Sequence, residues 1–316
     1  MWTFRNGKFP VLSGSKLSKT KFDKVVKWVV TLKILFKRYK LEMLMVLPLI
    51  IFILGFTLVP VLQCIYYSFQ DPLTGAFPTL DNYRLIVGSR KFGDALKNTV
   101  LVTLIGLSLE MSVGMMVALL LTTKSRFRGI FRAITMIPMG VPTIVSGVIM
   151  LYIFSSNGYL NEFLYRIGVI KLPIDWAQGG LRTLFMVAIA DMWKVTPLVI
   201  ILLLSGLESI PSSIYEASAI DGATRFQNFF YITLPLIKPF FTIALIMRAI
   251  DAFRIFELPM VLAGRNTMFL GTYAYSEYFD YNNIHASGAA STILLLLIAA
   301  FVFGYIMMVG SREVEQ

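Results

Sequence analysis

The sequence predicts an all-α, polytopic membrane protein with six transmembrane helices. Of its 316 residues, 57% are hydrophobic, which is more apolar surface than a water-soluble domain can bury. The apolar residues form long runs without the alternation typical of β-strands, so helices are favoured over a barrel. Positive charge gathers beside these runs, as it does on the cytoplasmic flanks of membrane helices.

Six apolar runs are long enough to cross a bilayer, which takes about 20 helical residues. They cover residues 43–67, 99–121, 133–154, 181–204, 239–257 and 289–309. Pro138 and Pro142 are expected to bend the early part of the third span, because proline removes a backbone donor inside a helix. Residues 41–316 are therefore interpreted as one transmembrane domain.

The distribution of charge predicts the orientation. Residues 1–40 carry eleven Lys and Arg against one acid, Asp23, and lead directly into the first span. The linker after the second span carries four cations and no acid, namely Lys124, Arg126, Arg128 and Arg132. Basic flanks stay in the cytosol, so residues 1–40 are predicted to be a cytosolic segment and both termini to be cytosolic. This topology accounts for the net charge of +11 and does not indicate nucleic-acid binding.

Three loops then face outward, at residues 68–98, 155–180 and 258–288. The last of them alternates aromatic and polar residues between Thr272 and His285. Such a stretch is typical of surfaces that contact sugars or proteins, and equally of an aromatic belt at the membrane interface. Both interpretations stay open.

A moderately polar stretch lies between the fourth and fifth spans, on the predicted cytosolic side. Pro211 suits the first turn of a helix, and Gly222 suits its left-handed C-terminal stop. The helix between them is far shorter than a membrane span. We therefore predict a cytosolic coupling loop at about residues 205–238, able to bind a partner and transmit its motion to the bilayer.

The order of residues in this loop is distinctive: Glu216-Ala217-Ser218, Asp221-Gly222-Ala223, Ile232-Thr233-Leu234-Pro235 and Pro239. It closely resembles the cytoplasmic EAA loop of ABC importer membrane subunits, above all the carbohydrate-importing, maltodextrin-type permeases. Ser218 stands where many of these permeases carry Ala. The resemblance implies a type I ABC importer permease fold and a loop that docks on a separate ATPase. It assigns seven residues to ATPase coupling: Glu216, Ala217, Ser218, Asp221, Gly222, Ala223 and Pro235.

The same resemblance implies the partners and the location. They are two cytosolic ABC ATPases that bind ATP and Mg²⁺, a second, different but related permease subunit, and an extracytoplasmic solute-binding protein. The implied location is a bacterial inner membrane. The chain itself has no phosphate-binding loop of the Gly-x-x-x-x-Gly-Lys type, and His285, the only histidine, has no neighbouring His or Cys to complete a metal site. A non-catalytic permease subunit is predicted.

Charged residues inside the spans are the strongest sign of a solute site. Asp191 and Lys194 are three residues apart in the fourth span, and Arg248, Asp251 and Arg254 repeat every three residues in the fifth. Each set therefore shares one helical face. A charge at the centre of a lipid-facing helix costs about 2.5–3.5 kcal/mol, so these groups need partners or water.

Two interpretations of these charges compete. Either Asp191 and Asp251 only neutralise the cations and pin the helices together, or the groups line a hydrated passage, which intramembrane charges favour. The predicted substrate path comprises Asp191, Trp193, Lys194, Arg248, Asp251 and Arg254. Trp193 would stack on a sugar ring or pack toward lipid. Glu110 in the second span is assigned only a polar contact in the bundle.

The three cations of this set outnumber its two acids, which predicts an acidic, uronate-containing oligosaccharide as solute. The functional prediction is therefore one half of the passage of an ATP-driven oligosaccharide importer. The main alternative is an ion-gradient-driven secondary transporter or channel, which would favour inverted repeats that the sequence does not display. A membrane enzyme is disfavoured, because the sequence offers no catalytic constellation.

Overall fold

The computed structural model of the chain describes residues 39–123 and 126–310. Every regular element in this part is a helix, which confirms the predicted all-α fold. The predicted basic segment falls almost entirely outside the described residues, as do Lys124 and residues 311–316. The chain divides into two compact units, Met1–Leu62 and Gln63–Gln316.

The first unit contains the start of the first span. Helix α2 (Lys40–Ile53) continues through a π-helical turn (Leu54–Leu58) into α3 (Val59–Ser68). This stretch of 29 residues agrees with the predicted span to within a few residues. None of the side chains of α2 is buried within its own unit.

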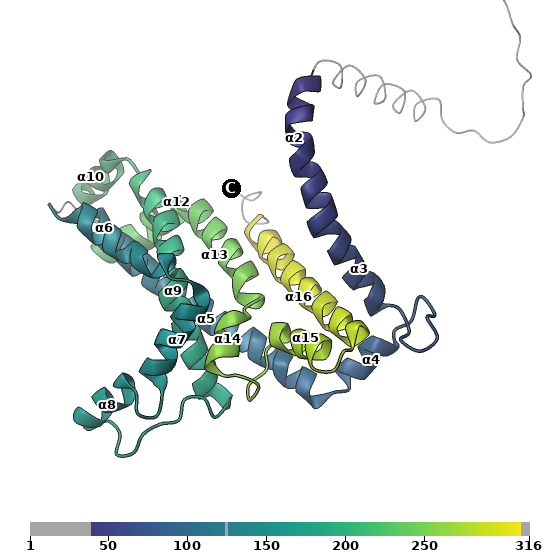
Figure 1. The fold of residues 1–316 in the computed structure, drawn as a ribbon. Helices are drawn as coiled ribbons and strands as arrows, with labels where there is room; N and C mark the ends of the chain where they lie inside the picture. Colours follow the sequence, from purple (N-terminus) through teal and green to yellow (C-terminus); the bar gives the residue numbers. More distant parts are fainter. Residues whose placement is uncertain (1–38, 124–125, 311–316) are drawn as a thin grey trace, which may run out of the picture. The chain divides into compact units, whose positions relative to one another are not determined.

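Two long helices form the core of the second unit. Helix α5 (Arg90–Thr122) packs along α9 (Gly180–Glu208), and α13 (Lys238–Phe253) packs against both (Figure 1). Gly114 permits the close approach of α5 and α9, because a Cβ at this position would lie 2.7 Å from Cγ1 of Val199. Both helices extend the predicted second and fourth spans at their ends.

The third predicted span is not one continuous helix, so this part of the prediction is wrong. Instead of one bent helix there are three pieces: α6 (Arg128–Met136), a 3₁₀ turn (Ile137–Gly140) and α7 (Thr143–Phe154). Pro138 lies in the 3₁₀ turn and Pro142 directly precedes α7, so the two prolines interrupt the helix rather than bend it. Helix α8 (Tyr159–Arg166) follows on the outward side of the predicted topology.

The fifth span ends four residues earlier than predicted, and the chain bends sharply just before it begins. Helix α13 ends at Phe253, and Glu257 instead begins α14 (Glu257–Leu262). Before α13, the chain forms α11 (Arg225–Gln227), a π-helical turn (Asn228–Thr233) and α12 (Leu234–Leu236). The stretch Arg225–Leu236 meets Lys238–Phe253 at 69°, so the described residues contain five spanning helices, or six if this bent pair is one span.

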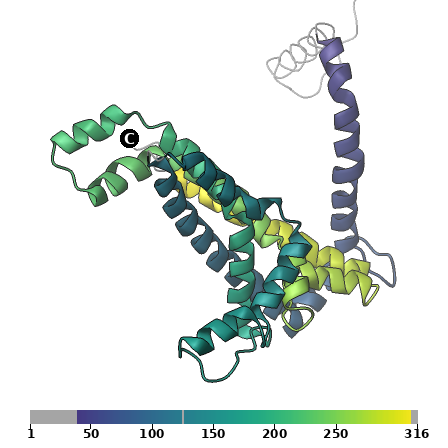
Figure 2. The same ribbon diagram turned by 60° about the vertical axis from the view of Figure 1, so that its left-hand side comes forward.

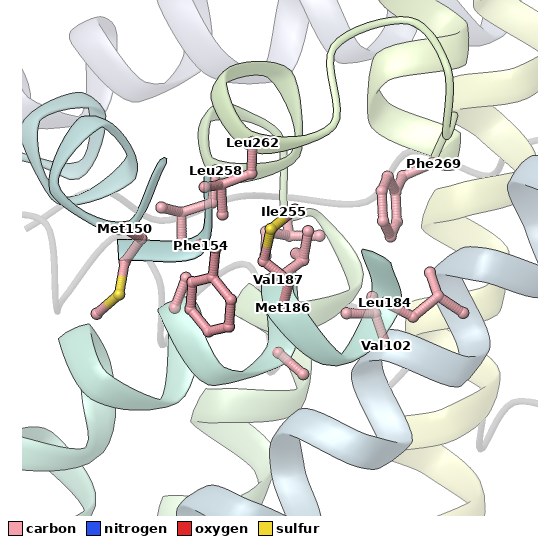
Figure 3. Packing of buried hydrophobic residues seen from close by; sticks show 12 residues of the cluster. Val102, Met150, Phe154, Leu184, Met186, Val187, Ile255, Leu258, Leu262 and Phe269 are labelled. Atoms are coloured by element: carbon pink, nitrogen blue, oxygen red, sulfur yellow. The ribbon is translucent and has the colours of Figure 1, made fainter. Parts of the chain in front are cut away.

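The remaining helices close the opposite end of the unit from α10 (Ser212–Ile220). They are α4 (Asp81–Val87) and α15 (Leu270–Phe279), and the last span, α16 (Ile284–Gly310), runs from them to α13. A buried apolar cluster joins α5, α7, α9 and α14 near this end, with Val102, Phe154 and Leu184 among its members (Figure 3).

Candidate functional site

Arg248 is the centre of a buried ion network in the middle of the bundle. Its side chain lies on α13 and the residue is only 2% exposed. Its Nε donates to Oε2 of Glu110 at 2.8 Å, and its Nη2 donates to Oε1 of the same carboxylate at 3.2 Å. Glu110 lies on α5 and is completely buried. This two-pronged geometry is the strongest that a guanidinium and a carboxylate form.

Two further carboxylates complete the surroundings of Arg248. Its Nη2 donates to Asp191 of α9 at 3.0 Å, and its Nη1 donates to Asp251 of α13 at 3.5 Å. Arg254 in turn donates to Asp251 at 2.6 Å. We refer to Glu110, Asp191, Arg248, Asp251 and Arg254 as the ion network. It links three helices, and it supplies the partners that buried charges need.

Glu110 corrects the charge balance predicted from the sequence. It is the principal partner of Arg248 and not a minor polar contact. With Glu110 included, the network holds three carboxylates and two guanidiniums, so it carries no excess of positive charge by itself. Lys194 is the remaining cation of the predicted path, and it forms no ion pair within the described part of the chain.

The pattern of residues around Glu110 indicates that its side chain faces other helices, which the isolated charge does not show by itself. Small and polar residues recur every three or four positions along α5, and all of them are buried: Thr99, Thr103, Gly106, Glu110 and Gly114. Such a stripe marks the face of a membrane helix that packs against other helices. An acid on this face is directed at protein and therefore at a partner.

A pocket of about 420 Å³ opens beside the ion network. Five of the predicted path residues line it: Asp191, Lys194, Arg248, Asp251 and Arg254. Phe256 and Glu257, where α14 begins, add an aromatic ring and a further carboxylate. Trp193 lies elsewhere, since it packs against the apolar cluster of α7, α9 and α14. We call this cavity the network pocket.

The predicted coupling loop forms a helix, a corner and a returning stretch. Pro211 is the residue that precedes α10, and Gly222 has a left-handed φ of +76°. The Ala223 N–H donates to the Ser218 carbonyl and the Gly222 N–H donates to that of Ala219, which is the hydrogen-bond pattern of a Schellman stop. We call residues 211–236 the coupling segment, which extends from the bundle in Figure 2.

The coupling segment is held by local bonds. The Thr224 hydroxyl accepts from the Gln227 N–H, and the Gln227 side chain accepts from the Thr224 N–H, forming a capping box. One side-chain contact joins α10 to the returning stretch, because the hydroxyls of Tyr215 and Thr233 lie 2.9 Å apart. Phe229 and Leu234 of the returning stretch also pack against the apolar cluster of α5 and α9, so the segment is held both by its own hydrogen bonds and by the bundle.

The predicted coupling residues occupy different environments. Five of them are exposed, namely Glu216, Ala217, Asp221, Gly222 and Pro235. Ala223 is half-buried, whereas Ser218 is buried and its hydroxyl donates to the Tyr215 carbonyl. A small residue is thus required at position 218, and Ser meets this requirement as Ala does.

Large apolar side chains on the coupling segment are left uncovered. Ile220 is 87% exposed, Phe226 78% and Tyr231 79%. Phe226 also lines an apolar pocket of about 740 Å³, whose walls include Leu207 and Phe229. Clustered apolar exposure of this kind marks a surface that binds a partner.

A further ion cluster ties α6 to the end of α9 beside the coupling segment. Arg128 and Arg132, both from the predicted cytosolic linker region, form ion pairs with Glu208. Glu208 is the last residue of α9, so this contact fixes the point from which the chain enters the coupling segment.

Comparison with known proteins gives consistent matches. The family described as "binding-protein-dependent transport system inner membrane component" matches residues 110–312. The trehalose/maltose transport system permease protein MalF of Thermococcus litoralis is 37% identical over 284 residues, which cover 87% of this chain and 96% of that protein. The trehalose transport system permease protein SugA of Mycobacterium tuberculosis is 30% identical over 282 residues, which cover 86% of this chain and 89% of that protein.

A solved structure shows the same fold. It is that of a bacterial ABC transporter involved in the import of the acidic polysaccharide alginate, and its chain superposes with a TM-score of 0.76 at 24% identity. The match covers 90% of this chain and all of that one. This likeness confirms the predicted fold of an ABC importer permease.

Proposed function

The chain belongs to the family of binding-protein-dependent transport system inner membrane components, and from this premise we propose that it is the membrane-spanning subunit of an ATP-driven oligosaccharide importer. Membership confirms the resemblance to sugar-transporting ABC permeases that the coupling loop predicted. Relatives named for trehalose, maltose and arabinooligosaccharides support a sugar as the solute.

The network pocket carries this proposal. Charged side chains that line a pocket within membrane-spanning helices cost much free energy unless the pocket holds water or a polar solute. We infer that it forms one half of the passage and that a second permease subunit supplies the other half. A solute-binding protein delivers the sugar from the outward side.

The prediction of an acidic solute now depends on two side chains. Arg248 is committed to three carboxylates, so it holds the wall of the pocket and does not grip the solute. Lys194 and Arg254 remain to contact uronate carboxylates. Lys194, which no described carboxylate neutralises, is the stronger candidate.

The solute is tested on the purified complex of permeases, ATPases and solute-binding protein in proteoliposomes. If the natural solute is acidic, trigalacturonate should stimulate ATP hydrolysis. Lys194→Met should then lower this stimulation about tenfold, because one charge-assisted contact is lost. Lys171→Met, which replaces an exposed lysine of the loop after α8, serves as control. Stimulation by maltotriose but not by trigalacturonate removes the acidic solute and keeps the importer.

We further propose that the coupling segment docks on one of two cytosolic ATPases, which bind ATP and Mg²⁺. The exposed Glu216 offers a polar contact, and Phe226 offers an apolar one. Residues 1–40 lie on the same cytosolic side in this arrangement. The exposed apolar rings and the local rigidity of the segment support the docking role.

Gly222→Pro tests the docking directly. Proline cannot adopt a φ of +76°, and it removes the N–H that donates to Ala219. The variant is expected to insert normally into the membrane and to lose its ATPase. Gly168→Pro is a matched control, because Gly168 has a φ of +73° and donates to Tyr165, but lies in the loop after α8. ATPase binding by Gly222→Pro at the wild-type level would contradict the docking role.

Orientation is tested separately with a membrane-impermeant thiol reagent on intact cells, in a Cys64→Ser background. A cysteine at position 171 should react from outside, and one at position 216 should not. Labelling of position 216 from outside would place the segment away from any cytosolic ATPase and would favour a transporter driven by an ion gradient.

A further inference from the structure

A second charged pocket, of about 450 Å³, lies among the outward ends of the helices. It shares no lining residue with the network pocket. Three separate parts of the chain form it: the first turns of α5, the start of α9 and the loop between α14 and α15. We call it the cationic pocket.

Three cations and one acid line the cationic pocket, namely Lys91, Lys97, Arg265 and Asp94. Lys97 is exposed and forms no ion pair within the described residues. Lys91 lies over the ring of Tyr281, with its Nζ 5.7 Å from the ring centroid and 3.4 Å from the Tyr281 hydroxyl, and it forms no ion pair within the described residues. Arg265 donates to Asp280 at 2.7 Å, which fixes its guanidinium at the rim. With Asp94 and Asp280 both counted against the three cations, one positive charge remains, so the pocket has a positive potential.

The start of α9 adds backbone donors to this charge. Gly179 and Gly180 both line the pocket and both have left-handed φ angles, of +93° and +69°. They lead into a helix of 29 residues whose first turn contains no acid, so its N-terminus attracts anions. The Gly179 N–H already donates to the Thr183 hydroxyl at 2.8 Å, so the donors that this end offers are the N–H groups of the first helical turn, from Gly180 onward.

An unpartnered hydroxyl at the same place provides an independent indication. Thr267 is only 4% exposed, and its Oγ1 has no hydrogen-bond partner among the described residues. This oxygen lies 3.6 Å from the position that a Cβ on Gly179 would occupy, beside the start of α9. A buried hydroxyl without a partner costs free energy, and an anionic acceptor in the pocket would remove that cost.

The walls of the pocket are rigid. Asn98 donates to the Met268 carbonyl at 3.0 Å, and Leu270 donates its N–H to the Thr99 hydroxyl at 2.8 Å, so the loop is tied to α5. Val102, Leu184 and Phe269, from the same three parts of the chain, belong to one apolar cluster (Figure 3). A pocket whose backbone is held in place in this way binds an anion without the loop first being ordered.

We propose that the cationic pocket receives an aspartate or glutamate side chain of the solute-binding protein. The family depends on such a protein. Long exposed cations at the rim of a rigid pocket attract and align a charged partner before contact. The inference deepens the proposed function, because it requires the orientation given above.

Association of the importer's solute-binding protein with the purified complex in nanodiscs tests the proposal. The binding protein is loaded with the sugar that stimulates the wild-type complex, and rates are compared at about 10 mM and about 1 M salt, where the Debye lengths are ~30 Å and ~3 Å. Lys97→Glu and Arg265→Glu are expected to slow association about tenfold at low salt and little at high salt. Lys171→Glu, an exposed lysine outside the pocket, is expected to associate like the wild type.

Each outcome has a clear meaning. Equal association rates for the wild type and both pocket variants at low salt would overturn the proposal, as would an equal effect of Lys171→Glu. Unchanged association combined with weaker stimulation by trigalacturonate alone would assign the pocket to the solute and also overturn it. A wild-type complex that no binding protein stimulates would instead contradict the proposed function itself.

Discussion

The ion network and the coupling segment satisfy their polar groups in opposite ways. In the network, Arg248 finds its strongest partner 138 positions away in sequence, and both side chains are buried. In the coupling segment, Thr224 and Ser218 bond to groups three positions away, while large apolar rings face outward. The first region stabilises the fold, and the second presents a surface. Substitutions in the two regions should therefore affect different measurements.

The largest effect is expected at Arg248. Arg248→Met leaves the carboxylate of Glu110 buried without its partner, and breaking such a pair costs about 3–5 kcal/mol. The thermal unfolding midpoint of the purified protein should fall accordingly.

The double variant Glu110→Leu/Arg248→Met is the control for this prediction. It removes both charges of the strongest pair and should recover part of the lost stability, since an apolar pair of similar volume replaces a buried ion pair at little cost. The recovery is partial because Asp191 still lacks its bond to Arg248. A double variant less stable than Arg248→Met would show that the network is solvated and not buried.

The next effect is expected at Phe226, on ATPase affinity and not on stability. Phe226 is 78% exposed, so Phe226→Ala should leave the unfolding midpoint unchanged. If the ring fills a pocket of the ATPase, its loss costs about 2 kcal/mol, or roughly 30-fold in Kd. Phe163→Ala, at an exposed ring of α8, should not change this affinity. A lower unfolding midpoint for Phe226→Ala would contradict the view that the coupling segment presents a surface and does not stabilise the fold.

A smaller effect is expected at Tyr215, because its contact with Thr233 joins the two halves of the coupling segment. Tyr215→Phe removes one neutral hydrogen bond, worth about 1 kcal/mol. ATPase affinity should fall roughly fivefold. Thr233→Val should have the same effect, and the double variant should add nothing further, which binding measurements on the four proteins would decide.

The smallest effect is expected at Arg254, within the network itself. Its side chain is 65% exposed, so its pair with Asp251 is worth about 0–1 kcal/mol. The unfolding midpoint of Arg254→Ala should stay close to that of the wild type. A loss equal to that of Arg248→Met would mean that exposure does not separate the strong and weak members of the network.

Sequence reasoning succeeded where bonds are local. The stop at Gly222 needs only residues within five positions, and a glycine followed by a new cap at Thr224 indicates it. The long apolar spans were equally predictable, because their length alone decides them.

Sequence reasoning failed where a feature depends on residues that are far apart in the sequence. The partner of Arg248 is on another helix, so the excess of cations predicted from two spans was wrong once Glu110 was included. The prolines of the third span were recognised, but the sequence did not show that they interrupt the helix instead of bending it. The π-helical turn at Asn228–Thr233 was not predicted, because hydropathy does not distinguish it from an α-helical turn.

The joint at Ile237 gives the molecule a lever arm. This buried residue alone separates the stretch Arg225–Leu236 from α13, where the two meet at 69°. Arg248 lies eleven residues beyond Ile237, or about 16.5 Å from the joint, so a swing of about 10° would carry it roughly 2.9 Å. Its bonds to Glu110 are too short to stretch that far. In the proposed arrangement, a push on the coupling segment must therefore either rotate α5, α9 and α13 as a single body or break the ion pairs between Arg248 and its carboxylates.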